Sequence, residues 1–283
     1  MQYQPYILKV YLGPTPFKVF HYSSRLMVVL PNMTSHYQNI QPSGGDTGVP
    51  LNINRRLHWI KQHIDLRGKW ILDCGCGSGA YVLKFFEFSP YVFGVEYNVD
   101  KVRAFRSLKI YPDHVSQGII EKLDFEEGQF DFVLLNEVLE HVSDEVQALD
   151  EIYRVLKPSG TLVLFSPNRL YPFETHGCSL KRFGILVPHF FPFIPYIPVG
   201  FGNKILNYNA RNYFPWELKR KIKQHGFKIQ RHTYMWQTFE NISGNSPRLL
   251  IFMSPFLRRV SFTLEKIPLV KAFGVSQVLI ATK

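Results

Sequence analysis

Apolar runs of strand length alternate with stretches of helical periodicity through the middle of the chain. The expected strands cover residues 70–73, 91–96, 115–119, 130–135 and 161–165, and the expected helices cover 80–88, 100–108 and 144–156. Strands and helices that alternate over short connections are typical of right-handed βαβ units. The pattern therefore predicts an α/β fold with a doubly wound, mostly parallel sheet.

The alternation stops at residue 166 and returns at about residue 213. "PWELKRKIKQHGF" has Pro215 near a helix start and Gly226 just past the helix end, which predicts a helix there. "FKIQRHTYMW" and "SQVLIATK" supply the last expected strands. We therefore divide the chain into an N-terminal extension and linker (1–50) and one domain (51–283). This domain includes an insert (166–212) and a basic C-terminal part (213–283).

Composition is that of a folded protein in a reducing compartment. Apolar residues make up 46% of the chain and charged residues 19%, which excludes a disordered chain. Two of the three cysteines, Cys74 and Cys76, lie too close together within a glycine-rich turn for a structural disulfide. The start, "MQYQPYILKVYLGPTPF", lacks the basic and apolar pattern of a signal peptide. These features predict a cytoplasmic protein.

Positive charge is concentrated in the C-terminal part. Residues 201–283 contain 14 Lys and Arg against 3 Asp and Glu, whereas residues 101–150 contain 5 against 11. A basic face of this kind favours anionic partners, namely a membrane surface, a phosphate-bearing substrate or nucleic acid. A merely solvated basic surface is the alternative. We expect peripheral contact with an anionic membrane, with nucleic acid as the weaker candidate.

The most apolar segment, "FGILVPHFFPFIPYIPVGF" (183–201), has the length of a membrane span. Its four prolines would each remove a helix hydrogen bond that lipid cannot replace. Either a loop that dips into a membrane or a lid over an apolar cavity fits better. Because the insert follows the fifth strand, where open sheets bind their ligands, we expect it to cover the site of the substrate.

A glycine turn follows the first expected strand in "WILDCGCGSGAY". Gly75, Gly77 and Gly79 allow the backbone to turn tightly and a ligand to approach it closely. The next strand ends at Glu96, whose carboxylate can accept hydrogen bonds from both hydroxyls of an adenosine ribose. The two features predict a site for a nucleoside cofactor, either NAD or S-adenosylmethionine.

Four motifs in order, "LDCGCGSGAY", "GVEYN", "FDFVLLNEVLEHV" and "IYRVLKPSGTLVLFSPN", resemble those of the class I S-adenosylmethionine-dependent methyltransferases. The resemblance covers about residues 70–168 and favours S-adenosylmethionine over NAD. It implies a Rossmann-like, seven-stranded sheet whose last strand is antiparallel. The proline-rich insert would then follow the fifth strand.

The resemblance also assigns roles to matching residues. Asp73 and the glycine turn would hold the methionine part of the cofactor, Glu96 the ribose and Tyr97 the adenine, while Asn136 would line the methyl-transfer side. Relatives often carry an Asp after the third strand to meet the adenine amino group. Ile119 stands there, so backbone groups would have to make that contact.

In "NEVLEHV", Glu137, Glu140 and His141 follow the fourth strand and would share one face if the segment were helical. In much of the family this motif serves packing and hydrogen bonding. In ubiquinone O-methyltransferases and small-RNA 2'-O-methyltransferases, which this pattern resembles, it binds a divalent ion. This gives a second interpretation, in which these three residues and His176, which follows the fifth strand, form a site for an ion such as Mg²⁺.

Transfer to an oxygen also requires a base, and His176 and His141 are the best-placed candidates among ten histidines. An ordinary loop histidine bonded to Glu174 is the alternative for His176. The predicted function is O-methylation of a small or lipid-like acceptor, such as a quinone, a glycolipid or a lipid-linked sugar. The alternatives are methylation of RNA or another nucleic acid, and a non-catalytic module that binds S-adenosylmethionine.

Overall fold

A computed structural model describes residues 18–22, 25–29, 51–188, 191–239 and 248–283 of the chain. Most of the expected extension and linker, 1–50, lies outside the described residues. Two of its segments are described, β1 (Lys18–Tyr22) and β2 (Arg25–Val29), which pair antiparallel. The domain prediction for residues 1–50 therefore stays a prediction.

Seven strands form one central sheet in the order β11-β12-β7-β6-β3-β4-β5. Their bounds are β3 (Ile71–Cys74), β4 (Val92–Glu96), β5 (Val115–Gln117), β6 (Phe130–Asn136), β7 (Leu156–Pro167), β11 (Lys228–Met235) and β12 (Ser276–Thr282). Strand β12 pairs antiparallel with both β7 and β11, and the pairs from β7 to β5 are parallel. The predicted seven-stranded sheet with a reversed last strand is confirmed.

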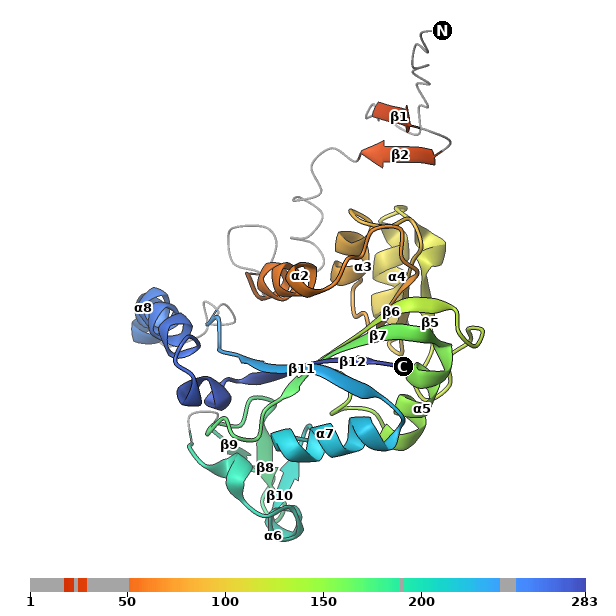
Figure 1. The fold of residues 1–283 in the computed structure, drawn as a ribbon. Coiled ribbons are helices and arrows are strands. Elements are labelled where there is room, and N and C mark those ends of the chain that lie inside the picture. Colours follow the sequence, from red (N-terminus) through yellow and green to blue (C-terminus); the bar gives the residue numbers. More distant parts are fainter. Residues whose placement is uncertain (1–17, 23–24, 30–50, 189–190, 240–247) are drawn as a thin grey trace, which may run out of the picture.

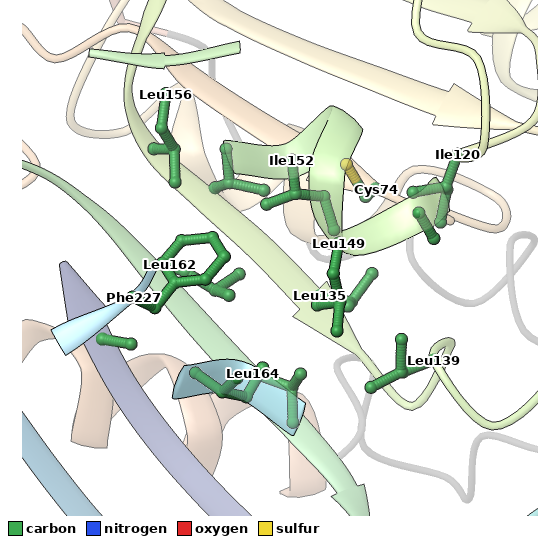
Figure 2. Close-up of a cluster of buried hydrophobic side chains, with 14 of the residues drawn as sticks. Cys74, Ile120, Leu135, Leu139, Leu149, Ile152, Leu156, Leu162, Leu164 and Phe227 are labelled. Carbon is green, nitrogen blue, oxygen red and sulfur yellow. The ribbon is translucent and has the colours of Figure 1, made fainter. Parts of the chain in front are cut away.

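Helices cover both faces of this sheet (Figure 1). Helices α2 (Leu51–His63), α3 (Ala80–Phe85) and α4 (Val99–Ser107) pack on one face, and α5 (Glu145–Val155) and α7 (Pro215–Gln224) on the other. Figure 2 shows the second layer, where Leu149 and Ile152 of α5 lie over Leu135, Leu162 and Leu164 of the sheet. Burial of these periodic apolar faces stabilises the two layers and fixes the strand ends in place.

The insert folds into a small unit of its own. It contains a three-stranded sheet of β8 (Cys178–Leu180), β9 (Leu186–Val187) and β10 (Leu206–Tyr208), a short 3-10 turn η2 (Ile194–Tyr196) and helix α6 (Val199–Ile205). Cys178, Ile194 and Leu206 fill its interior. Four partly buried side chains pack against this interior: Leu180, Val187, Ile197 and Tyr208. Eight further large apolar side chains of the insert are exposed: Phe183, Ile185, Leu186, Phe191, Phe193, Val199, Phe201 and Ile205.

These exposed side chains belong to the segment that the sequence predicts either to cover the substrate site or to dip into a membrane. The interior of the insert is too small to bury them, so they face away from it. The choice between a lid and a loop that dips into a membrane stays a prediction.

The remaining elements are η1 (Pro112–His114), α8 (Arg248–Leu264) and η3 (Leu269–Phe273). Helix α8 and η3 lie between β11 and β12, at the end of the molecule that also carries the insert (Figure 1). Within the described part of the chain, no helix combines the length and the apolar character needed to cross a membrane.

Candidate active site

The glycine turn joins β3 to α3 and takes backbone angles that favour glycine. Gly75, Gly77 and Gly79 have φ of 72°, 57° and 80°. A Cβ on Gly75 would lie 2.5 Å from Val138, and one on Gly79 would lie 2.2 Å from the ring of Phe105, whereas one on Gly77 would meet nothing within 4 Å. The two outer glycines thus allow close packing, and the middle one faces open space where a ligand can approach the backbone.

Glu96 closes this turn from the end of β4. Its Oε2 accepts a hydrogen bond from the backbone N–H of Gly77 at 2.8 Å, and its Oε1 accepts one from Asn98 N–H at 3.0 Å. Each carboxylate oxygen can accept a second hydrogen bond. The carboxylate is therefore fixed in position by the backbone and still has acceptor capacity for two ribose hydroxyls, as the predicted role requires.

Asp73 lies beside Glu96 at the end of β3 and is almost completely buried. Its Oδ2 has no hydrogen-bond partner among the described residues. Burial, together with the charge of Glu96, raises the pKa of Asp73 to about 8. A buried carboxyl without a partner fits a cationic ligand group, and the amino group of S-adenosylmethionine is such a group.

The other expected cofactor contacts surround this acidic pair. Tyr97 and Ile119 are both exposed, so they offer apolar surface on which an adenine could lie. Asn136 ends β6, and its Oδ1 accepts a hydrogen bond from Arg56 of α2 at 2.5 Å. Asn136 is thus oriented by α2, the helix that begins the domain, 80 residues earlier in the chain.

Glu137 differs from the sequence prediction in both conformation and partners. Residues 137–142 form a turn and not a helix, and Glu137 has φ of 54°. Its Oε1 accepts a hydrogen bond from Arg56 Nη2 at 2.6 Å and another from the hydroxyl of Ser276. Burial alone would raise the pKa of Glu137, but Arg56 and Ser276 outweigh it and lower that pKa. In this arrangement Glu137 is not grouped with the other candidate metal ligands.

Glu140, His141 and His176 do lie together. One ligand atom from each falls within 4.8 Å of the others, and His176 Nε2 is 3.8 Å from Glu140 Oε1. The Glu140 carboxyl group is buried, and its side chain lies within hydrogen-bonding range of the Glu137 side chain. Burial and the charge of Glu137 raise the pKa of Glu140, while burial lowers the pKa of His141. The cluster thus contains a buried acidic group that is suited to a cation or a proton.

The position of His176 is fixed by its loop. Its backbone N–H donates to Glu174 Oε1 at 3.0 Å, and its carbonyl accepts from Asn209 Nδ2 at 3.0 Å. Glu174 is buried and also accepts from Asn212 at 2.7 Å. The alternative predicted for His176, a loop histidine bonded to Glu174, is therefore also observed, but the bond is made by the backbone N–H of His176. The imidazole ring takes no part in this bond and faces Glu140.

A polar cavity of about 450 Å³ lies next to this cluster. Glu140 and His141 form part of its wall. Most of its other lining residues are polar or basic and include Lys181, Asn203, Asn207, Asn209 and Arg211. Much of the wall comes from the insert, which agrees with the expected place of the insert on the substrate side.

Arg56 is the main site residue that sequence reasoning missed. It contacts Asn136, Glu137 and Ser276, and its guanidinium lies 4.7 Å from the centre of the Phe165 ring. A signal was present, because Arg56 stands between Ile53 and Ile60 on the apolar face of its helix. A charge on such a face is rarely buried without a partner.

Comparison with known proteins agrees with this geometry. Residues 72–164 match a family described as "Methyltransferase domain". The matched range begins in β3 and ends in β7, so it contains the glycine turn, Glu96 and the turn with Glu140.

Two curated relatives align with less than half of the chain. A ubiquinone biosynthesis O-methyltransferase of Erwinia tasmaniensis is 32% identical over 119 residues, which cover 40% of this chain and 49% of the relative. A tRNA U34 carboxymethyltransferase of Desulfotalea psychrophila is 29% identical over 147 residues, which cover 47% of this chain and 46% of the relative. The chain thus spans about half the length of the curated relatives it matches.

The fold extends further than the sequence similarity. The crystal structure of an S-adenosylmethionine-dependent methyltransferase from Mesorhizobium loti superposes with a TM-score of 0.52 at 14% identity. The superposition covers 80% of this chain and 96% of that one. At this identity the likeness shows a shared fold.

Proposed function

We propose that this chain transfers a methyl group to an oxygen of a small or lipid-like acceptor. The premise is that the chain carries a class I S-adenosylmethionine-dependent methyltransferase domain. A quinone, a glycolipid or a lipid-linked sugar belongs to this class. The observation that carries the proposal is the buried Glu140 carboxylate with His176 Nε2 3.8 Å away, at the end of the sheet where the cofactor residues lie.

The proposed step is an in-line displacement. The acceptor oxygen forms a bond to the methyl carbon while the carbon–sulfur bond breaks, and S-adenosylhomocysteine leaves. The hydroxyl proton passes to His176, whose Nδ1 lies 3.2 Å from Thr175 Oγ1 and whose Nε2 faces Glu140 at 3.8 Å. Glu96, Asp73 and the glycine turn would hold the cofactor, so that the enzyme contributes mainly alignment.

In the alternative to a base at His176, a divalent ion fits the same three side chains. Glu140, His141 and His176 would hold it, and it would supply a Lewis acid that lowers the pKa of the acceptor hydroxyl. Two imidazoles and one carboxylate suit manganese, iron or zinc better than magnesium, which prefers oxygen ligands. The predicted Mg²⁺ thus gains no support from these ligands, and Glu137 is bonded to Arg56 instead.

The polar cavity beside the cluster supports an acceptor with a polar end. Its asparagine and basic side chains could bind hydroxyl or phosphate groups of a sugar or a quinone head. The exposed apolar side chains of the insert lie on the same segment as part of this wall. An acceptor with a polar head and a long apolar portion would use both surfaces.

One observation favours a second candidate, an RNA acceptor. The tRNA-modifying relative is similar over 47% of this chain, and the C-terminal part is strongly basic. Phosphate contacts would make RNA binding depend steeply on salt. Binding of tRNA whose affinity falls sharply between low and moderate salt, with methyl transfer to it, would favour this candidate.

The test measures cofactor binding and methyl transfer separately. We expect S-adenosylhomocysteine to bind by calorimetry, and labelled methyl to pass from S-adenosylmethionine to quinone or glycolipid hydroxyls. His176→Ala should reduce turnover by about a hundredfold or more while it leaves cofactor affinity unchanged. His58→Ala, at an exposed position of α2, is the matched control and should keep full turnover.

Three outcomes would contradict parts of the proposal. Normal turnover of His176→Ala would remove this residue from the mechanism. Full activity in excess chelator would exclude the metal. Cofactor binding without transfer to any acceptor of either class would indicate a non-catalytic binding module.

A further inference from the structure

Helix α8 is oriented with its polar side toward the protein. Arg258 Nε donates to the carbonyl of Thr238 at 2.7 Å, and Ser261 Oγ donates to that of Gln237 at 2.8 Å. Just past the helix end, Glu265 accepts from Arg55 and from the backbone N–H of Trp236. At positions 258, 261 and 265 these side chains share one face. Polar contacts thus hold the helix against the domain.

The opposite face of α8 is apolar and exposed. Phe252, Phe256 and Val260 follow at intervals of four residues, so they form one stripe. Phe252 is 83% exposed and Phe256 is 63% exposed, and Leu269 of η3 is 88% exposed. Large apolar side chains that gather in this way mark a contact surface.

The insert and α8 start from adjacent points of the sheet. Met235 at the end of β11 is paired with Ser276 at the start of β12, and Ser276 is paired with Pro167 at the end of β7. The chain leaves β7 into the insert and leaves β11 toward α8 at this same edge. The two exposed apolar segments therefore extend from one end of the domain, as Figure 1 also shows.

The charges on these two segments have one sign. Residues 166–212 contain a single acid, Glu174, and residues 248–275 contain a single acid, Glu265. Glu174 is buried, and Glu265 is paired with Arg55. Exposed cations are present on both segments: Lys181, Arg182, Lys204, Arg259 and Lys266. Apolar side chains among cations, without free acids, match an anionic lipid surface.

We propose that α8 and η3, with the outward apolar side chains of the insert, form a surface that binds an anionic lipid bilayer. Phe252, Phe256 and Leu269 enter the interfacial region, and Arg259 and Lys266 contact lipid headgroups. The surface adjoins the edge of the sheet that holds Glu140 and His176. The inference deepens the proposed function and rests on it only for the lipid-like acceptor, which would reach the site from the bilayer.

The test is flotation of the full chain with vesicles. The vesicles contain equal parts of phosphatidylcholine and phosphatidylglycerol, and phosphatidylcholine vesicles serve as the neutral comparison. We expect binding to the anionic vesicles that weakens as salt is added. The double variant Phe252→Ser with Phe256→Ser should bind at least about tenfold more weakly. The double variant Phe252→Leu with Phe256→Leu keeps the apolar stripe and should bind nearly as well as the wild type.

Charge reversal tests the headgroup contacts. Arg259→Glu with Lys266→Glu should reduce vesicle binding by about tenfold or more. The matched control is Lys228→Glu with Arg231→Glu, because these exposed cations lie in the first half of β11, away from the strand end that leads to α8, and should not affect binding. Equal melting temperatures of all variants would show that the fold is unchanged.

Each failure is distinguishable from failure of the proposed reaction. No flotation at low salt, or equal flotation of the serine variant, would overturn the lipid surface even if methyl transfer to a soluble acceptor is normal. Dimers that the serine variant abolishes, without vesicle binding, would make the surface a contact between two copies and also overturn it. Vesicle binding without methyl transfer would support the surface and contradict only the reaction.

Discussion

The two halves of the candidate site are built in different ways. On the cofactor side, Gly77, Glu96 and Asn98 lie within 22 residues of one another in the chain and are joined through backbone N–H groups. On the acceptor side, Arg56, Glu137 and Ser276 come from distant segments and are joined through side chains. The first half follows from local backbone geometry, and the second depends on the packed fold.

Substitutions in the two halves should therefore have different effects on ligand binding and on the free energy of unfolding. A carboxylate held by backbone groups loses ligand contacts when it is replaced, but the fold around it stays. A buried ion pair between distant segments leaves an uncompensated charge when one partner is removed. We therefore expect substitutions on the cofactor side to affect binding, and those on the acceptor side to affect stability as well.

The largest expected effect is that of Arg56→Ala. It removes the ion-pair partner of the half-buried Glu137 carboxylate together with the hydrogen bonds from Arg56 to Asn136 and Ser276, so the free energy of unfolding should fall by about 3 kcal/mol in chemical denaturation. Arg67→Ala is the matched control, because its ion pair with Asp65 is fully exposed and its loss should not be measurable. A wild-type unfolding curve for Arg56→Ala would contradict the view that the acceptor side depends on this pair.

Glu96→Ala should leave the fold largely unchanged and weaken cofactor binding. Two hydrogen bonds from ribose hydroxyls to a charged acceptor are lost, so the affinity for S-adenosylhomocysteine should fall by about a hundredfold in calorimetry. Glu127→Ala, at an exposed acid far from the glycine turn, should bind as the wild type does. Unchanged affinity of Glu96→Ala would exclude the ribose role.

Asp73 should couple binding to pH. Burial and then the charge of Glu96 raise its pKa from 3.8 to about 8, so the cofactor-free fold prefers the protonated acid. The contribution of Asp73 to the stability of the cofactor-free fold is fully present below the pKa of this residue in the unfolded chain. It is lost as the pH rises through about 8, the pKa in the folded state. A bound ammonium would ionise Asp73, so binding at neutral pH should release up to about one proton.

Calorimetry in buffers of different ionisation enthalpy measures this proton. Asp73→Asn should abolish the proton release. Asp131→Asn is the control and should keep it, because Asp131 is paired with Lys157 and lies at the start of β6, at the opposite end of the strands from Asp73. Proton uptake on binding, or release that Asp73→Asn does not change, would contradict the assignment.

The smallest expected effects are those of the two helix caps. Asn98 accepts from two backbone N–H groups at the start of α4, and Asp144 does the same at the start of α5. Either change to Ala should lower the free energy of unfolding by about 1 kcal/mol in denaturant titration. Because each cap contacts only its own helix, the losses of stability at α4 and at α5 should be similar. A much larger loss at either cap would show that the capping residue supports more than its own helix.

The sheet and the glycine turn could be predicted because their signals are local. Alternating periodicity defines the strands, and three glycines after a strand define a turn whatever lies elsewhere in the chain. The turn at Glu137 could not be predicted in this way. "EVLEHV" has apolar positions that suit a helix, but Arg56 and Ser276 hold Glu137 in a left-handed conformation, and Val138 packs against Gly75.

The grouping of Glu140, His141 and His176 was predicted in part. Strands β6 and β7 are neighbours and parallel, so the loops that follow them lie close together at the carboxyl ends of the strands. This part of the grouping follows from the order of the strands. The burial of Glu140 and the outward direction of the insert depend on how much apolar volume each unit can enclose, and this quantity appears only in the folded chain.

The pairing of Pro167, Ser276 and Met235 across three neighbouring strands has a consequence for how the protein can be re-engineered. Both the insert and α8 are excursions that leave and rejoin the sheet at this one edge, outside the two apolar layers. A segment grafted between the same anchor points would meet the same candidate cofactor site. Under the proposed function, exchange of these segments should change the acceptor without redesign of the candidate cofactor site.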